Sequence, residues 1–170
     1  MEKKYKLTEE TIIVDGRTLH RIEALRDFND VKKGDKGGFI EKEDNLSQSD
    51  DCWVYGDAMV YGNANVYGDA KVYYNAEVCG NAKIYDNAEV DGDAVVYGNS
   101  EVYGNAEVFG SAEVYGNAMI YGNAMVCGHA EVCGNAAVYD NGAVYGVAMV
   151  YGNAEIYGDR EVHGDEKVGE

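Results

Sequence analysis

The sequence predicts an all-β fold, a three-sided parallel β-solenoid of about 6–7 coils. Three observations support this prediction. Every sixth residue from Val54 to Val168 is Val or Ile, without a gap. The hexad reads Val-Tyr-Gly-Asn-Ala-x, with Gly third in 16 of the 19 complete hexads and Ala fifth in all but four. The chain has 22 Gly, 15 Tyr and no Pro, a composition that suits many short strands joined by tight corners.

Each hexad position has a physical interpretation. Val is β-branched and suits a strand, and its regular recurrence marks the buried row. Its two neighbours then point outward, because side chains alternate along a strand. Gly and Asn form the turn, since both tolerate positive φ, and Ala returns inward where a corner leaves little room. One hexad is therefore one strand and one corner, and three hexads close a coil that stacks in parallel on the next.

The ends of the repeat differ from its middle. Residues 1–50 are expected to form an N-terminal hairpin and cap, and residues 51–170 the solenoid. Asp15-Gly16 is a favoured two-residue turn and predicts a hairpin of residues 11–14 and 17–22, while residues 30–40 are expected to form a loop and a first irregular coil. At the other end, Arg160 and Glu166 occupy the inward fifth position. Charges are costly inside a dry prism, so we expect this coil to fray or its charges to project past the end.

The pattern aliphatic-x-x-x-small-x resembles the hexapeptide-repeat family of left-handed parallel β-helices, and that resemblance implies left-handed coils. The segments Phe28-Asn-Asp-Val-Lys, Gly37-Gly-Phe-Ile and residues 46–53 resemble the N-terminal region of YdcK-type hexapeptide-repeat proteins of bacteria and phages. Those proteins are described as transferases from their fold. The resemblance also implies a homotrimer and, in its acyltransferase members, a histidine general base near a subunit boundary.

Reading every third hexad gives the outward columns of the prism. One column after Val is an unbroken tyrosine ladder: Tyr67, Tyr85, Tyr103, Tyr121, Tyr139 and Tyr157. We interpret it as structural, because stacked aromatic rings stiffen a sheet, and keep an interface as the alternative. The acidic columns place Glu89 over Glu107 and Glu113 over Glu131. They are interpreted as a solubility device or as a negative face for a basic partner.

An apolar patch on the later coils is the best candidate for contact between subunits, with a trimer favoured. It comprises Phe109, Met119, Met125, Cys127, Ala137 and Ala143. His129 is a weak catalytic candidate, because it stands where a turn residue is expected and no loop interrupts the hexads to form a pocket. We expect no cofactor and no metal site.

The charge balance limits the possible partners. The chain has 31 acidic and 14 basic residues, a net charge of −17. Such a charge argues against direct binding to nucleic acid or to an anionic membrane. No apolar run approaches a membrane span and the N-terminus lacks an apolar signal stretch, so we expect a cytoplasmic protein.

The predicted function is a non-catalytic acidic scaffold that binds a protein through its flat Tyr- and Glu-bearing faces. One alternative is a phage-type inhibitor that mimics nucleic acid and occupies a basic groove of a host protein. The other alternative is a trimeric acyltransferase, which the resemblance implies.

Overall fold

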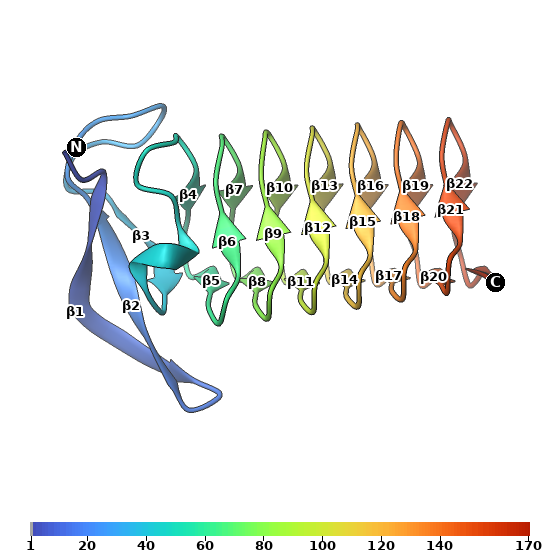
Figure 1. The fold of residues 1–170 in the computed structure, drawn as a ribbon, viewed down its shortest axis with the longest axis horizontal. Helices are drawn as coiled ribbons and strands as arrows, with labels where there is room; N and C mark the ends of the chain where they lie inside the picture. The colour runs from blue at the N-terminus through green and yellow to red at the C-terminus, as the bar shows by residue number, and fades with distance from the viewer. Residues whose placement is uncertain (1) are drawn as a thin grey trace.

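Short strands stack into a solenoid along residues 53–169 of the computed structural model, which describes residues 2–170 (Figure 1). The N-terminal segment contains β1 Tyr5–Val14, β2 Arg17–Ala24, β3 Lys36–Ile40 and the 3₁₀ turn Glu43–Asn45. The solenoid strands are β4 Trp53–Val54, β5 Met59–Val60, β6 Asn65–Val66, β7 Lys71–Val72, β8 Glu77–Val78, β9 Lys83–Ile84, β10 Glu89–Val90, β11 Val95–Val96, β12 Glu101–Val102, β13 Glu107–Val108, β14 Glu113–Val114, β15 Met119–Ile120, β16 Met125–Val126, β17 Glu131–Val132, β18 Ala137–Val138, β19 Ala143–Val144, β20 Met149–Tyr151, β21 Glu155–Ile156, β22 Glu161–Val162 and β23 Lys167–Gly169.

Three sheets form the walls of the solenoid. A seven-stranded sheet contains every third strand from β4 to β22, and a six-stranded sheet every third strand from β6 to β21. The third wall is a ten-stranded sheet that runs β1-β2-β3-β5 and then continues through every third strand to β23. The solenoid strands pair in parallel, and each residue faces the residue one coil away, as Glu89 faces Glu107 and Val90 faces Val108. The predicted parallel β-solenoid is therefore confirmed.

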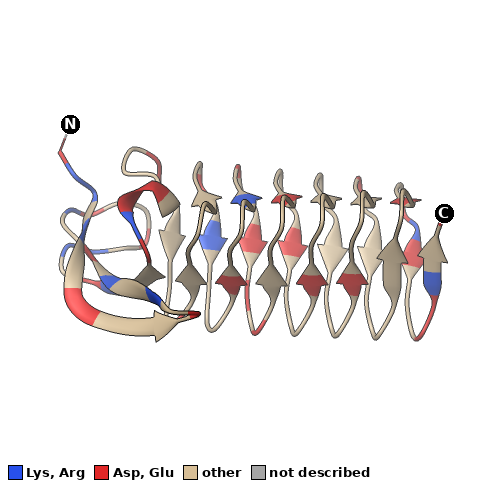
Figure 2. Ribbon diagram, turned by 60° about the horizontal axis from the view of Figure 1, so that its bottom comes forward, with Lys and Arg blue, Asp and Glu red and all other residues tan. Residues whose placement is uncertain are grey.

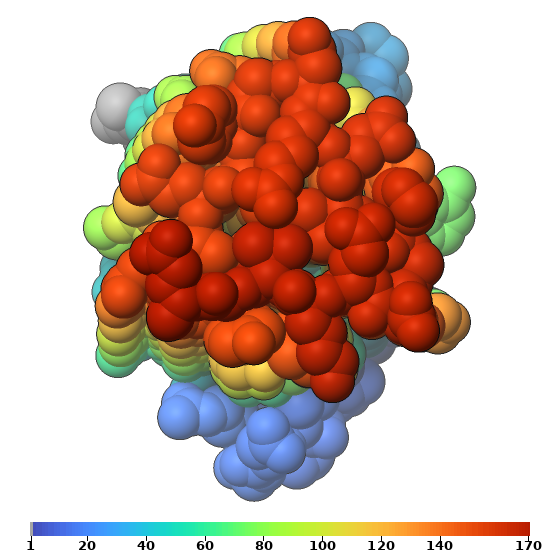
Figure 3. All heavy atoms as spheres, turned by 90° about the vertical axis from the view of Figure 1, so that its right-hand side faces the viewer, coloured from blue at the N-terminus to red at the C-terminus, as the bar shows by residue number. Residues whose placement is uncertain are grey.

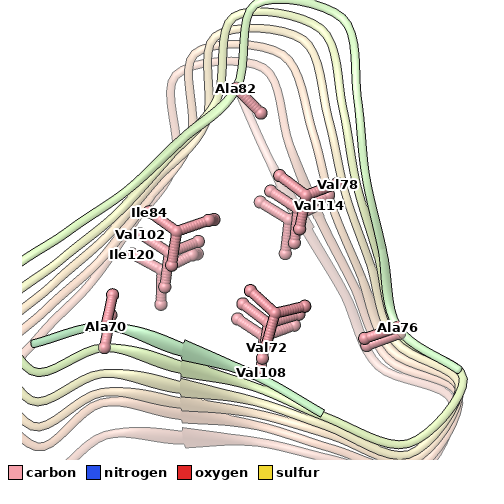
Figure 4. Close-up of a cluster of buried hydrophobic side chains, with 14 of the residues drawn as sticks. Ala70, Val72, Ala76, Val78, Ala82, Ile84, Val102, Val108, Val114 and Ile120 are labelled. Carbon is pink, nitrogen blue, oxygen red and sulfur yellow. The ribbon is translucent and has the colours of Figure 1, made fainter. Parts of the chain in front are cut away.

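The inward row of the prism is aliphatic, as the hexad predicts. Val102, Val108 and Val114 are fully buried, and Ala112 and Ala118 are buried at the corners between them. Val and Ile side chains from the three walls point toward one another inside the coil, and Ala side chains fill the corners (Figure 4). Since each buried residue stacks on its equivalents in the coils above and below, the interior is one continuous core.

Glycine in the third position is favoured by the spacing of the coils. Gly98 has φ +74°, and a Cβ added there would lie 2.8 Å from the carbonyl oxygen of Gly116 in the next coil. Both the left-handed backbone and the close approach therefore favour glycine. Tyr74, Asp86 and Asp140, which replace it, keep the same backbone with φ of 56–57°.

The N-terminal segment covers the first coil. The predicted hairpin is present: Asp15 and Gly16 both have positive φ, and β1 pairs with β2 in antiparallel register. β3 then joins the hairpin to β5, so the hairpin extends the ten-stranded wall (Figure 1). In an end-on view the coils superimpose and the hairpin projects beyond their outline (Figure 3). The boundary at residue 50 stays a prediction, because one sheet runs across it.

Two outward residues lie under this segment. The Trp53 side chain is 1% exposed, and its ring meets those of Tyr5 and Phe28 edge to face. Tyr61 is buried with Leu19 and Phe39 of the hairpin sheet. The alternation rule predicts that both residues point away from the prism, but it cannot show that another segment covers them.

The last coil keeps its strands, so the expectation of fraying is wrong for the backbone. β22 pairs with β19 and β23 pairs with β20 in the same register as the earlier coils. Arg160 and Glu166 are exposed, as expected for charges that project past the end of the core. The coil is retained because Val162 is still fully buried on the coil before it.

Candidate functional site

The tyrosine ladder is confirmed as a continuous stack. Consecutive rings from Tyr67 to Tyr139 lie 4.8–4.9 Å apart and are tilted by 2–4°, and Tyr139 stacks on Tyr157 at 5.4 Å. Because each ring covers the face of the next, the ladder presents ring edges and hydroxyl groups to the outside. It is a stiffening element and offers little ring face for a ligand to stack on.

Tyrosine hydroxyls hold glutamates in place along the walls, a feature that the sequence interpretation missed. In each pair the tyrosine donates to a glutamate sixteen residues later, on the adjacent coil; the pairs are Tyr61–Glu77, Tyr85–Glu101, Tyr115–Glu131, Tyr139–Glu155 and Tyr145–Glu161. Four of these hydrogen bonds are 2.7–3.2 Å long. The spacing Tyr(n)–Glu(n+16) is visible in the sequence, but it also fits Tyr73–Glu89 and Tyr97–Glu113, between which the described structure has no hydrogen bond.

The hydrogen bonds change the acidity of the tyrosines. The bond to Glu155 raises the pKa of Tyr139 to about 12. Burial, followed by the hydrogen bond to Glu101, also raises the pKa of Tyr85. Both tyrosines therefore stay protonated and donate to carboxylates throughout the physiological pH range.

The acidic columns have the predicted registers and lie on two walls, as the column positions predict. Glu89 and Glu107 are neighbours on the seven-stranded sheet, and Glu113 and Glu131 on the ten-stranded sheet. Acidic positions recur along the solenoid strands, whereas basic ones are concentrated in the N-terminal segment (Figure 2). Like charges in adjacent strands repel, so these columns cost some stability.

Glu101 has a different environment. It lies between Lys83 and Met119, and its carboxylate accepts a hydrogen bond from the Lys83 ammonium at 2.9 Å. This contact lowers the pKa of Glu101. Glu101→Gln would therefore remove an ion pair, and we expect it to cost less than about 1 kcal/mol.

Asparagine ladders close two of the three corners of the prism. At the corner between the ten- and six-stranded sheets, side-chain amides bond from coil to coil through Asn63, Asn81, Asn99, Asn117, Asn135 and Asn153. At the corner between the six- and seven-stranded sheets, the ladder runs through Asn87, Asn105, Asn123, Asn141 and Asp159.

These ladders correct the sequence interpretation of the turn. Within residues 2–170, no residue in the fourth hexad position has positive φ, because the third residue alone takes the left-handed conformation. Asn63 and its equivalents are therefore explained by side-chain hydrogen bonds between coils. The same correction applies to His129, whose neighbour Gly128 carries the positive φ.

The third corner, between the seven- and ten-stranded sheets, lacks such a ladder. Its fourth-position residues are Asp57, Asn75, Asp93, Ser111, His129, Val147 and Asp165. In the described chain a single side-chain bond, from Asn75 to Asp93, links neighbouring coils at this corner. We call this the seven–ten corner. Val147 stands there 59% exposed.

The predicted apolar patch is divided between two walls. Met125, Ala143, Phe109 and Cys127 belong to the seven-stranded sheet or directly follow its strands. Met119 and Ala137 lie on the six-stranded sheet, and Tyr121 separates Met119 from Met125 along the chain. Met119 and Met125 are each 39% exposed, whereas Ala137 is 5% exposed. The six residues do not form one flat surface.

The histidines and cysteines lie apart from one another. His129 is exposed at the seven–ten corner, and His163 stacks on Tyr145 with its Nε2 3.6 Å from a Glu166 carboxylate oxygen. All four cysteines are free, and Cys52 is buried. Residues 2–170 contain no cluster of three or more His, Cys, Asp or Glu side chains suited to a metal ion.

A buried lysine sits under the N-terminal segment, and no sequence signal indicated it. The Lys4 side chain is fully buried, and its ammonium donates to the carbonyl oxygens of Asp50 and Cys52, the latter at 2.8 Å. Burial lowers the pKa of Lys4. The lysine ties β1 to the first coil and belongs to the structure of the cap.

Comparison with known proteins supports the resemblance drawn from the hexads. Residues 112–128 match the family model described as YdcK beta solenoid repeat. The repeat region is a YdcK-like β-solenoid. A protein named uncharacterized acetyltransferase YdcK, from Escherichia coli (strain K12), is 41% identical over 61 residues.

The likeness to YdcK is partial in extent. The match covers 31% of this chain and 19% of the length of the E. coli protein. The family model matches residues inside the repeat. It does not match residues 28–53, which resemble the N-terminal region of YdcK-type proteins.

Among residues 2–170, no helix has the length and apolar character of a membrane span.

Proposed function

We propose that the protein is a rigid acidic scaffold that binds a basic protein partner through the walls of its solenoid. The observation that carries this proposal is the set of tyrosine–glutamate hydrogen bonds, which hold carboxylates in fixed positions on all three walls. A carboxylate already held in place loses less conformational freedom when a partner binds. Regular negative charge on a stiff body also steers a cationic partner into register.

The test of this proposal reverses the charge of three wall glutamates and compares them with three acidic residues of the N-terminal segment. Glu131, Glu155 and Glu161, which each accept a tyrosine hydrogen bond, are changed together to Lys, and binding to poly-L-lysine is measured over a salt series. A control variant changes Glu2, Glu9 and Asp44 of the N-terminal segment to Lys, which alters the net charge equally. We expect the wall variant to lose binding and salt dependence and the control to retain most of both. Equal loss in the two variants would contradict the proposal.

Nucleic-acid mimicry, the alternative function, would also use the acidic walls. A competition experiment with DNA distinguishes it from the scaffold. A mimic competes with duplex DNA for a DNA-binding protein, and its affinity falls steeply with salt. A scaffold for other basic proteins binds without such competition. Competition by DNA would therefore favour the mimic.

Acyl transfer is a second candidate, favoured by the name of the E. coli relative and by the exposed imidazole of His129. The test is transfer of an acetyl group from acetyl-coenzyme A to small amine or hydroxyl acceptors. Activity that His129→Ala abolishes would establish the enzyme. Activity that survives His129→Ala would place catalysis elsewhere.

A further inference from the structure

The seven–ten corner departs from the pattern of the other two corners in consecutive coils. Where the other corners carry hydrogen-bonded amides, it has Ser111, His129 and Val147 in succession. Val147 is 59% exposed and replaces a polar residue in a solvent-facing turn. An isolated exposed aliphatic group needs no explanation, but Val147 is flanked by two more large apolar side chains.

The flanking residues belong to the same coil. Tyr145 directly follows β19 on one side of the corner, and Met149 begins β20 on the other. Both are half-buried, so each keeps part of its surface exposed next to Val147. The three residues form an apolar ridge at one level of the solenoid, which we call the Val147 ridge.

Charged residues lie one coil before and one coil after the Val147 ridge, and in one column their signs are opposite. One coil before it, the corner carries His129 and Glu131; one coil after it, it carries Asp165, Lys167 and the exposed Glu166, whose carboxylate lies 3.6 Å from His163 Nε2. The registers Glu131–Met149–Lys167 follow one column of the ten-stranded sheet. Glu131 and Lys167 therefore lie one coil below and one coil above the ridge.

We propose that a second copy of this chain packs against the seven–ten corner, antiparallel, about a two-fold axis at the level of Val147. In this arrangement, a residue one coil before the ridge meets the partner's residue one coil after it. Glu131 then faces Lys167 of the second copy, and His129 faces Asp165. Val147 and Met149 meet their own equivalents at the centre. The corner is thus complementary to itself in its apolar surface and in the Glu131–Lys167 column.

Other occupants fit these observations less well. A parallel second copy would place every residue at the level of its own equivalent, so Glu131 would not reach Lys167. A purely basic partner would be repelled by Lys167. The other two corners bear uninterrupted amide ladders over the same coils, without an exposed apolar residue in the fourth position.

The contact covers few coils and is expected to be weak. Three overlapping coils span about 14 Å along the solenoid. A contact of this size is at the low end for protein interfaces, so we expect a dimer that forms with rising concentration. This inference concerns self-association and does not depend on the proposed binding of a basic partner.

Disulfide trapping distinguishes the antiparallel register from other arrangements. The native Cys79, Cys127 and Cys133 are first changed to Ser. Two variants, His129→Cys and Asp165→Cys, each with one accessible thiol besides the buried Cys52, are then oxidised separately and as a mixture. We expect a cross-linked dimer from the mixture and little from either variant alone. A strong homodimer from His129→Cys alone would indicate a parallel arrangement and overturn the proposal.

Sedimentation over a range of concentrations provides the second measurement. Val147→Asn restores the usual residue of this position and should weaken the dimer about tenfold or more, because it removes the centre of the contact. Asn135→Asp, on the closed corner of the same coils, is the control and should leave the dimer unchanged. A monomer at every concentration, or a stable trimer, would also overturn the proposal. Circular dichroism confirms that each variant retains the fold.

Discussion

Both ends of the solenoid bury an aliphatic interior, but only the N-terminal end is covered by a separate segment. At the N-terminal end, Trp53 is covered by the rings of Tyr5 and Phe28, and Lys4 is buried beside them. At the other end, Val162 is buried although Arg160 and Glu166 stand exposed in the inward positions beside its strand. One end therefore depends on a separate segment, and the other on the stacking of the repeat alone.

The contacts at the two ends differ in sequence separation. Coil-to-coil bonds in the repeat join residues about one coil apart, such as Asn99 and Asn117, which are 18 apart. The cap joins more distant residues, such as Lys4 and Cys52, which are 48 apart. Stability of stacked repeats is close to a sum of unit and nearest-neighbour contributions. Damage to a middle coil should therefore cost more than damage at either end.

The largest effect is expected from a charge in the middle of the prism. Val102 is fully buried, so Val102→Asp places an uncompensated carboxylate in the core. We expect a loss of about 5 kcal/mol or more in the free energy of unfolding, measured by urea denaturation. Glu107→Gln is the control on an outward position; it removes repulsion from Glu89 and should be neutral or slightly stabilising. A control loss as large as that of Val102→Asp would invert the assignment of inside and outside.

The next largest effect is expected from a change in the cap. The loss of protection should be confined to the N-terminal end of the molecule. Trp53→Ala removes a buried ring and is expected to cost about 3 kcal/mol. Hydrogen exchange should accelerate mainly in β1 to β5, because the later coils stack on one another. Met125→Ala, in the same column but 39% exposed, is the matched control and should cost well under half as much. Uniform acceleration along the whole chain would contradict a local cap.

A smaller effect is expected from the corner ladders. Asn117 accepts from Asn99 and donates to Asn135, each at 3.0 Å, so Asn117→Ala breaks two side-chain hydrogen bonds. We expect a loss of about 1 kcal/mol. Ser111→Ala at the seven–ten corner is the control, because the described structure gives the Ser111 hydroxyl no hydrogen bond between coils. If both variants unfold at the same urea concentration, the ladder contributes nothing measurable.

The smallest effect is expected from the ionisation of the tyrosines, which changes the free energy of unfolding only at alkaline pH. The folded protein raises the pKa of Tyr139 to about 12 and also raises that of Tyr85. Between pH 10 and these higher values the folded state holds more protons than the unfolded state. The stabilisation is therefore complete below pH 10 and is lost as pH rises through the folded-state values.

Alkaline unfolding tests this sign. The urea midpoint should fall steadily above pH 10, and tyrosinate absorbance should rise together with unfolding. Tyr139→Phe should reduce the pH dependence. The lowered pKa of Lys4 acts in the opposite direction up to its ordinary value of 10.5, but it is a single group. A midpoint that stays constant from pH 9 to pH 11 would contradict the raised tyrosine pKa values.

Much of the repeat could be predicted because its contacts recur with the period of the sequence. The buried Val and Ala rows, the column registers and the stacked tyrosines all follow from counting residues. Counting also finds every Tyr–Glu pair that forms a hydrogen bond, but it adds Tyr73–Glu89 and Tyr97–Glu113, which form none in the described structure. The apolar patch could not be judged by counting, since Met119 and Met125 lie on different walls.

The sequence by itself determined the period, the inside and outside of each strand and the partner of each strand, because neighbours in a solenoid are a constant distance apart along the chain. Only the tertiary structure decided what covers Trp53 and Tyr61, why Lys4 is buried, and that asparagine serves the corners through its side chain. Those features depend on contacts that occur once, between segments with no fixed spacing. A single long-range contact leaves no periodic trace in a sequence, so it becomes visible only when the chain is folded.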